Sequence, residues 1–134
     1  MRQFLFGLWA AIWISASAVF AQDAEIKDVI QRQIEAFKKD DFATAFTFAS
    51  PMIQRLFRNS ENFGDMVREG YPMVWRPERV DFLGLRLQSG RMIQRVLITD
   101  MAGAEYVLEY FMIETENGWV INGVTLLGQP DASV

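Results

Sequence analysis

The amino-acid sequence predicts an α+β domain in which N-terminal helices pack on a curved four-stranded antiparallel sheet. Apolar residues recur three and four positions apart in the first half of the chain, which is typical of helices that lie on a core. In the second half they alternate with polar residues, and three turn signals separate the alternating stretches. The 134 residues suffice for one such domain with a short extension.

The helical half starts with an amphipathic stretch at 23–39, where Asp23 is placed to cap the first turn and two lysines end the last turn. Ser50 and Pro51 form a second start signal, a capping side chain followed by a proline in the first turn. The shorter helices expected after the first one span 42–49, 52–58 and 60–69.

Three turn signals divide the second half of the chain, namely Ser89-Gly90, Met101-Ala102-Gly103 and Asn117-Gly118. The expected strands are 80–88, 91–100, 104–114 and 119–127. These turns also set the strand register, because side chains opposite each other share a face. The expected opposite pairs are Gln88 with Arg91, Asp100 with Ala104, and Glu116 with Trp119.

This register predicts one nearly apolar face, which we expect the helices to cover. Its members are Leu83, Leu85, Leu87, Met92, Val96, Ile98, Tyr106, Leu108, Tyr110, Met112, Trp119 and Ile121. The other face is mixed, and a cross-strand ion pair between Arg95 and Glu109 is expected on it. Its apolar residues favour a homodimer interface, and they are Ile93, Val107, Phe111, Ile113, Val120 and Val124.

Residues 1–21 have the layout of a secretory signal peptide, with an early arginine, an apolar run and then small residues. Cleavage is expected after Ala21, with Ala18 as the alternative site, and the product is expected in the periplasm or the medium. A retained membrane anchor is the competing interpretation, but it needs about 20 apolar residues and fewer are present. The domain then spans 22–127, and 128–134 is expected to be a flexible tail.

The composition excludes several classes of chemistry. The chain has no Cys and no His, so thiol nucleophiles, imidazole bases and the usual zinc ligands are missing. No spaced carboxylate cluster suggests a metal loop, and neither a metal nor another cofactor is expected. The formal net charge of −4 argues against nucleic acid or an anionic bilayer as a partner.

Polar side chains cross the predicted apolar face in a row: Gln94 is expected opposite Tyr110, and Tyr110 opposite Thr125. Such a row of amide, phenol and hydroxyl groups can orient a small apolar ligand held between the sheet and the helices. The competing interpretation is structural, with these groups hydrogen-bonded to each other or to buried water. The first interpretation predicts a non-catalytic module that binds a small molecule or another protein.

An enzyme is the alternative function. Asp81 and Tyr106 are expected near one end of the same face, where an apolar environment would raise the pKa of a carboxyl group towards use as a general base. With Tyr106 or Tyr110 as the proton donor, Asp81 would serve a small isomerase or dehydratase. The structural interpretation is that Asp81 ends a strand in solvent.

The chain resembles a known family at four stretches, which are 36–46, 63–67, 70–72 and 118–124. In its order of elements it is similar to the nuclear transport factor 2-like, or cystatin-like, cone fold. More narrowly it resembles a secreted bacterial family named domain of unknown function 4864. The resemblance implies a cavity inside a curved sheet and dimers through the outer sheet face, but no catalytic residue is carried over, because the chain lacks the histidine of a His–Asp dyad.

Overall fold

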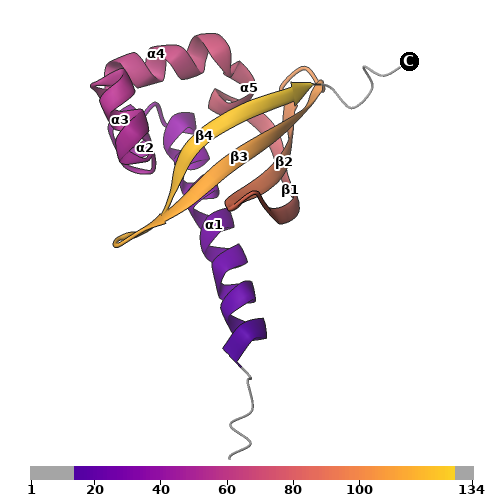
Figure 1. Ribbon diagram of the computed structural model, residues 1–134. Helices are drawn as coiled ribbons and strands as arrows, with labels where there is room; N and C mark the ends of the chain where they lie inside the picture. Colours follow the sequence, from indigo (N-terminus) through magenta and orange to yellow (C-terminus); the bar gives the residue numbers. More distant parts are fainter. Residues whose placement is uncertain (1–13, 129–134) are drawn as a thin grey trace, which may run out of the picture.

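Within residues 14–128, which the computed structural model describes, five helices precede four strands, and the helices lie against one face of the sheet (Figure 1). This confirms the predicted α+β class. We call the face turned to the helices the inner face and the opposite one the outer face. The helices are α1 (Ile14–Lys38), α2 (Phe42–Thr47), α3 (Pro51–Phe57), α4 (Ser60–Gly70) and α5 (Pro72–Trp75).

Helices α2, α3 and α4 are each capped by a side chain that accepts a hydrogen bond from a backbone N–H in the first turn. Asp41 accepts from the backbone N–H of Thr44 at 3.2 Å, and Ser50 accepts from that of Ile53 at 3.3 Å. Asn59 caps α4 in the same way. Helices of this length are marginal by themselves, so their stability depends on packing against the sheet and α1.

The predicted cap at Asp23 is wrong, because α1 already begins at Ile14 and runs through this position. Asp23 pairs instead with Lys27 one turn later, at 3.1 Å. The N-terminal part of α1 projects beyond the sheet in Figure 1, and Phe20 there is 73% exposed. Residues 1–13 and 129–134 lie outside the described residues. The first range holds part of the predicted signal peptide and the second nearly all of the predicted tail, so these two predictions remain untested.

The strands are β1 (Pro77–Gln88), β2 (Arg91–Asp100), β3 (Glu105–Thr115) and β4 (Gly118–Gly128). They form an open antiparallel sheet in the order β1-β2-β3-β4. The first two predicted turns are confirmed: Gln88 opposes Arg91, and Asp100 pairs with Ala104 through a backbone hydrogen bond of 2.8 Å.

The third turn differs from the prediction. Glu114, not Glu116, lies opposite Trp119, because Gly118 already pairs with Thr115. The register is therefore displaced by two residues. Since side chains alternate with a period of two, Trp119 and Ile121 still point to the inner face.

Two irregularities in the strand pairing move residues to the face opposite the predicted one. In β1 the pairing shifts between Phe82 and Leu85, so Val80 and Phe82 pack on the core while Leu83 is 40% exposed. In β4 a shift opposite Phe111 and Met112 places Val124 on the inner face. The turn signals do not reveal such bulges, each of which inserts a residue and inverts the alternation beyond it.

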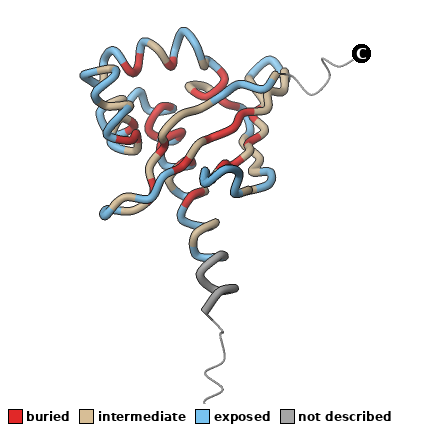
Figure 2. The backbone as a smooth tube through the Cα atoms, in the orientation of Figure 1, coloured by how far each residue is buried: buried red, intermediate tan, exposed pale blue. Residues whose placement is uncertain are grey.

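The hydrophobic core lies between the inner face and the helices, where the buried stretches of β2, β3, α1 and α4 meet (Figure 2). A short backbone bridge connects the helical layer to β4: Ile121 N–H donates to Phe48 O, and Ser50 N–H donates to Ile121 O, both at 2.8 Å. The Ser50 hydroxyl also donates to Asn122 Oδ1 at 2.8 Å. These bonds hold the start of α3 beside the sheet.

Among residues 14–128, none of the helices combines the length and the apolar character needed to cross a membrane.

Candidate functional site

A cavity of about 240 Å³ lies between the helical layer and the inner face of β3 and β4. Its volume is somewhat below that of typical small-molecule pockets, which span roughly 300–1,000 Å³. None of the lining side chains carries a formal charge at neutral pH. The lining residues are Gln33, Phe37, Ala49, Ile53, Leu56, Phe57, Phe63, Met66, Val67, Tyr71, Val74, Tyr110, Ile121, Gly123 and Val124.

Packed aromatic rings form one wall of the cavity. The ring of Phe63 lies 5.8 Å from that of Phe37 and 5.8 Å, edge to face, from that of Phe57. Aromatic rings at these separations stabilise one another beyond their burial. The wall therefore has a defined shape, which α1, α3 and α4 build together.

Close packing of α4 against α2 holds this wall in place. A Cβ atom added at Gly64 would lie 2.7 Å from the ring of Phe42, so the glycine permits an approach that a larger residue would prevent. The sequence contains Gly64 inside a predicted helix, where glycine is unfavourable, and this was the available signal for a close contact.

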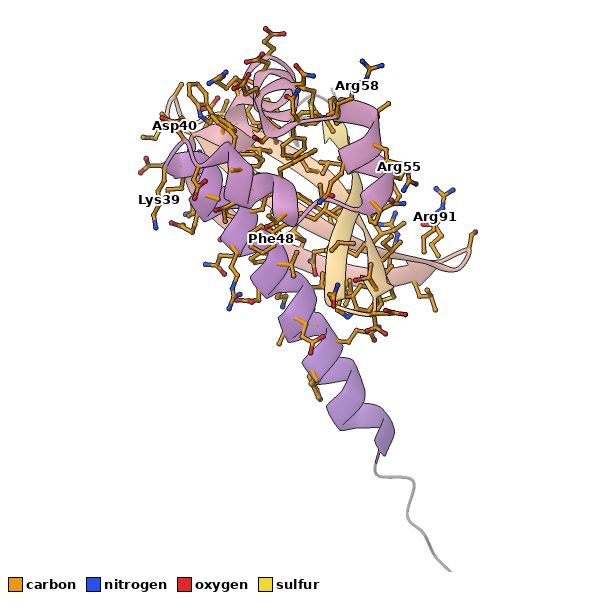
Figure 3. The ribbon with its side chains drawn as sticks, turned by 90° about the vertical axis from the view of Figure 1, so that its left-hand side faces the viewer. Lys39, Asp40, Phe48, Arg55, Arg58 and Arg91 are labelled. Carbon is orange, nitrogen blue, oxygen red and sulfur yellow. The ribbon has the colours of Figure 1, made fainter. Side chains whose placement is uncertain are left out.

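Leu56 on α3 marks the opening of the cavity, since it lines the cavity and is 67% exposed. Its neighbours Arg55 and Arg58 point away from the body of the molecule (Figure 3). The positive charges of α3 therefore lie outside the opening, and the interior stays uncharged.

Tyr110 is the most deeply buried polar residue of the cavity lining, with no exposed surface. Among the described residues, no partner forms a hydrogen bond with its hydroxyl group. Burial, with a further contribution from neighbouring Tyr71, raises the pKa of Tyr110 far above its ordinary value. The phenol is thus a neutral hydrogen-bond donor at any physiological pH.

The other polar side chains of the lining already have partners in the protein. The Tyr71 hydroxyl donates to Val124 O at 3.1 Å, and Gln33 Nε2 donates to Ala45 O at 3.2 Å. The first bond connects the helical layer to β4, and the second connects α1 to α2. Among the described residues, the Tyr110 hydroxyl has no partner, and it lies behind the cavity surface, because the whole side chain has no exposed area.

The predicted polar row is brought together only in part. Gln94 lies opposite Tyr110 as predicted and is fully buried. However, it does not line the cavity: its Nε2 donates at 2.9 Å to Leu83 O, at the β1 bulge, and to Arg95 O. Thr125 lies opposite Glu109, exposed, because the β4 bulge turns it to the outer face. Its predicted place beside Tyr110 is wrong, and Val124 is there.

The alternative catalytic pair is not assembled. Asp81 pairs with Leu97 on the outer face, where Arg79 Nε lies 2.9 Å from its Oδ2. Tyr106 is on the inner face and donates to Asp100 Oδ2 at 3.3 Å. The sheet separates Asp81 from both tyrosines, because the β1 bulge inverts the predicted alternation. Within residues 14–128, moreover, no three acidic groups gather in a way that could hold a metal ion.

The outer face holds the predicted ion pair and a second arginine, Arg86, whose contact with Glu109 was not predicted. Arg95 Nη2 lies 3.2 Å from Glu109 Oε2, and Arg86 contacts the same oxygen. Glu109 is only 7% exposed, so these two guanidinium groups neutralise a nearly buried charge. The contact could have been expected from the β1–β2 hairpin register. That register places Arg86 opposite Ile93, on the strand next to the one that carries Arg95.

The sequence matches a protein-family model. A family model described as Domain of unknown function (DUF4864) matches residues 19–134, which include all of the core and the cavity. No curated protein matches the sequence. Because the matched stretch covers most of the chain, this protein belongs to the DUF4864 family.

Proposed function

We propose that this protein is a non-catalytic module that binds a small, largely apolar molecule in the cavity between α3, α4 and the sheet. The observation that carries the proposal is a cavity of about 240 Å³ with an uncharged, mainly apolar lining and with the exposed Leu56 at its opening. An apolar pocket with few polar groups is typical of a binding site. The cavity lining has no carboxylate and the chain has no histidine, which favours binding over proton transfer.

Substitution at the opening tests this function. Ile53→Trp fills the cavity from α3, because Ile53 is half-buried and lines it. Met52→Trp is the matched control, since Met52 is adjacent, half exposed and not part of the lining. In a thermal-shift screen with apolar metabolites, we expect a compound to stabilise the unaltered chain and Met52→Trp, but not Ile53→Trp. Equal stabilisation of all three proteins, or of none, would contradict the proposal.

We also propose that the protein is exported, that the signal peptide is cleaved after Ala21, and that the domain belongs to the nuclear transport factor 2-like superfamily. The first two proposals rest on the arginine, apolar run and small residues of the N-terminus. The third rests on the order of helices and strands. Cell fractionation tests export, which absence of the protein from the periplasm and the medium would refute, and mass spectrometry tests cleavage, which an intact mass including residues 1–21 would refute.

A second copy of the chain is the proposed partner of the outer face. Val107, Phe111 and Val120 are half-buried there and Ile113 is 38% exposed, with no described element covering them. The same face carries both Arg91 and acidic residues, so it is complementary to itself in charge. Light scattering is expected to give the mass of a dimer, and a monomer at micromolar concentration would refute this proposal.

A further inference from the structure

We infer that the cavity takes the apolar chain of an anionic amphiphile, and that the carboxylate or phosphate head of this ligand stays at the opening, beside Arg55 and Arg58. The inference rests on the proposed function, because it assigns the chemical class of the ligand for the same cavity. Three observations support it: the apolar walls behind the opening, the two exposed arginines of α3 and its end, and the acidic groove on α4.

The walls behind the opening are suited to a hydrocarbon chain. Ile53, Leu56 and Phe57 line the cavity from α3, and the ring of Phe57 packs there against that of Phe63. Leu56 is 67% exposed at the opening. A chain that enters past Leu56 buries its methylene groups against these side chains, and each buried methylene raises the affinity about fourfold.

The inner end of the cavity limits how far the chain can enter. Gln33 on α1 is 3% exposed; its Nε2 donates to Ala45 O, and its Oε1 has no partner among the described residues. A hydrocarbon that covered this acceptor would cost free energy, so the chain is expected to end short of it. Tyr110 offers the chain no polar contact, because its side chain has no exposed area. At about 30 Å³ per water-sized group, about 240 Å³ holds roughly eight carbons.

Two arginines lie outside this opening. Arg55 is next to Leu56 in α3, Arg58 is the C-cap residue, both are exposed, and α3 contains no acidic residue. The ion pairs of the described residues involve neither arginine. Both point away from the body of the molecule (Figure 3). A head held by them stays in water, so no charge has to be buried.

The charge on the α4 side favours the same orientation. Met66, which lines the cavity, also borders an open groove that contains Asp65 and Glu69. Asp65 pairs with Arg68, and Glu69 is exposed. An anionic head is therefore repelled on this side and attracted on the α3 side, whereas a cationic head would have the reverse preference.

The experiment compares three ligands with the same eight-carbon chain: octanoate, 1-octanol and octylammonium. Affinities are measured at pH 7 and low ionic strength by displacement of a fluorescent apolar probe from the full chain. We expect octanoate to bind about fivefold more tightly than 1-octanol, and octylammonium to bind most weakly. The net charge of −4 would by itself favour the cation, so this order cannot arise from the overall charge. Octyl phosphate in the same assay identifies the source, since tighter binding than octanoate indicates a phosphate ester and weaker binding a fatty acid.

Substitutions separate the head site from the cavity. The double variant Arg55→Gln/Arg58→Gln is expected to bind octanoate and 1-octanol equally, because only the octanoate head is attracted by the arginines. Lys27→Gln/Arg32→Gln is the matched control: it removes two positive charges from α1, outside the cavity lining, and it should keep the preference for octanoate. Ile53→Trp, which fills the cavity, is expected to weaken both ligands alike.

Equal binding of octanoate and 1-octanol to the unaltered protein, or tightest binding of octylammonium, would overturn the inference and leave the proposed function intact. A preference for octanoate that persists in the arginine variant, or that disappears in the α1 control, would overturn it as well. Octanoate binding that survives Ile53→Trp would show an anion on the surface instead of a chain in the cavity. Failure of all three ligands to bind would refute the proposed function itself.

Discussion

At the scale of single residues, the Asp40 carboxylate connects the turn after α1 to the adjacent residues Trp75 and Arg76. It lies in the turn after α1 in a left-handed conformation, with φ of 56°. Trp75 Nε1 donates to its Oδ1 at 2.9 Å, and Arg76 Nη2 lies 2.9 Å and 3.0 Å from its two oxygens. The Arg76 guanidinium also stacks over the Trp75 ring. Asp40 therefore joins the end of α1 to the start of β1.

This arrangement predicts a pH dependence of stability. The hydrogen bond from Trp75, followed by that from Arg76, lowers the pKa of Asp40 below its ordinary value of 3.8. The folded protein therefore holds the ionised form more strongly than the unfolded chain does. The resulting stabilisation is present above about pH 4 and is lost as the pH falls through the folded-state pKa.

Asp40→Asn tests this dependence, because asparagine tolerates the left-handed backbone but cannot ionise. Urea unfolding between pH 6 and pH 2.5 is expected to show a less stable variant at the upper end of the range. The two proteins should converge as the pH falls below about 4. A constant difference in the free energy of unfolding across the range would contradict the role of the ionised carboxylate.

At the scale of elements, the position of α4 decides whether the cavity exists. α4 contributes Phe63, Met66 and Val67 to the lining, and it approaches α2 closely only because residue 64 is glycine. The Phe42 ring at this contact lies between the Phe37 ring, at a centroid distance of 6.0 Å, and the Arg68 guanidinium, at 4.9 Å. The ring therefore has little freedom to move aside.

Gly64→Ala is expected to destabilise the protein by about 1–3 kcal/mol, because its Cβ would overlap the Phe42 ring. Gly70→Ala is the matched control: it lies at the end of the same helix, and an added Cβ there meets no atom within 4 Å. We expect the control to be neutral or slightly stabilising, since alanine favours a helix. Urea unfolding measures both, and equal stabilities would show that the α2–α4 contact is loose.

At the scale of the whole molecule, the folded body begins inside α1. Phe20 is exposed, whereas Ile26 and Ile30 have no exposed surface and belong to the core. Phe20 and Ala21 are exposed and add little to the buried area, even though both lie within α1. This division agrees with the proposed cleavage after Ala21.

A chain shortened to residues 22–134 is accordingly expected to unfold cooperatively at the temperature of the full chain. Removing residues 1–30 is the contrasting change, because it also deletes Ile26 and Ile30, each of which contributes about 1.5–3 kcal/mol by burial. Calorimetry is expected to show a cooperative transition for the first deletion and none for the second. Loss of the transition in the first deletion would place residues 1–21 within the fold.

Local patterns in the sequence sufficed to predict the class of the fold, the first two turns of the sheet and most of the inner face. Periodicity and turn residues are local signals, and they suffice where a strand is regular, as for Val96, Ile98, Leu108 and Tyr110, all of which are fully buried. The absence of histidine and cysteine likewise excludes imidazole and thiol chemistry from the composition alone.

Which polar residues lie side by side depends on the pairing of the folded strands. Bulges in β1 and β4 moved Asp81 and Thr125 to the outer face and brought Val124 beside Tyr110. The cavity likewise arises from the packing of side chains on α1, α3 and α4, which are far from β3 in sequence. Alternation along a strand cannot reveal either feature, because a bulge is a mismatch between two paired strands and a cavity depends on how several elements fill space together.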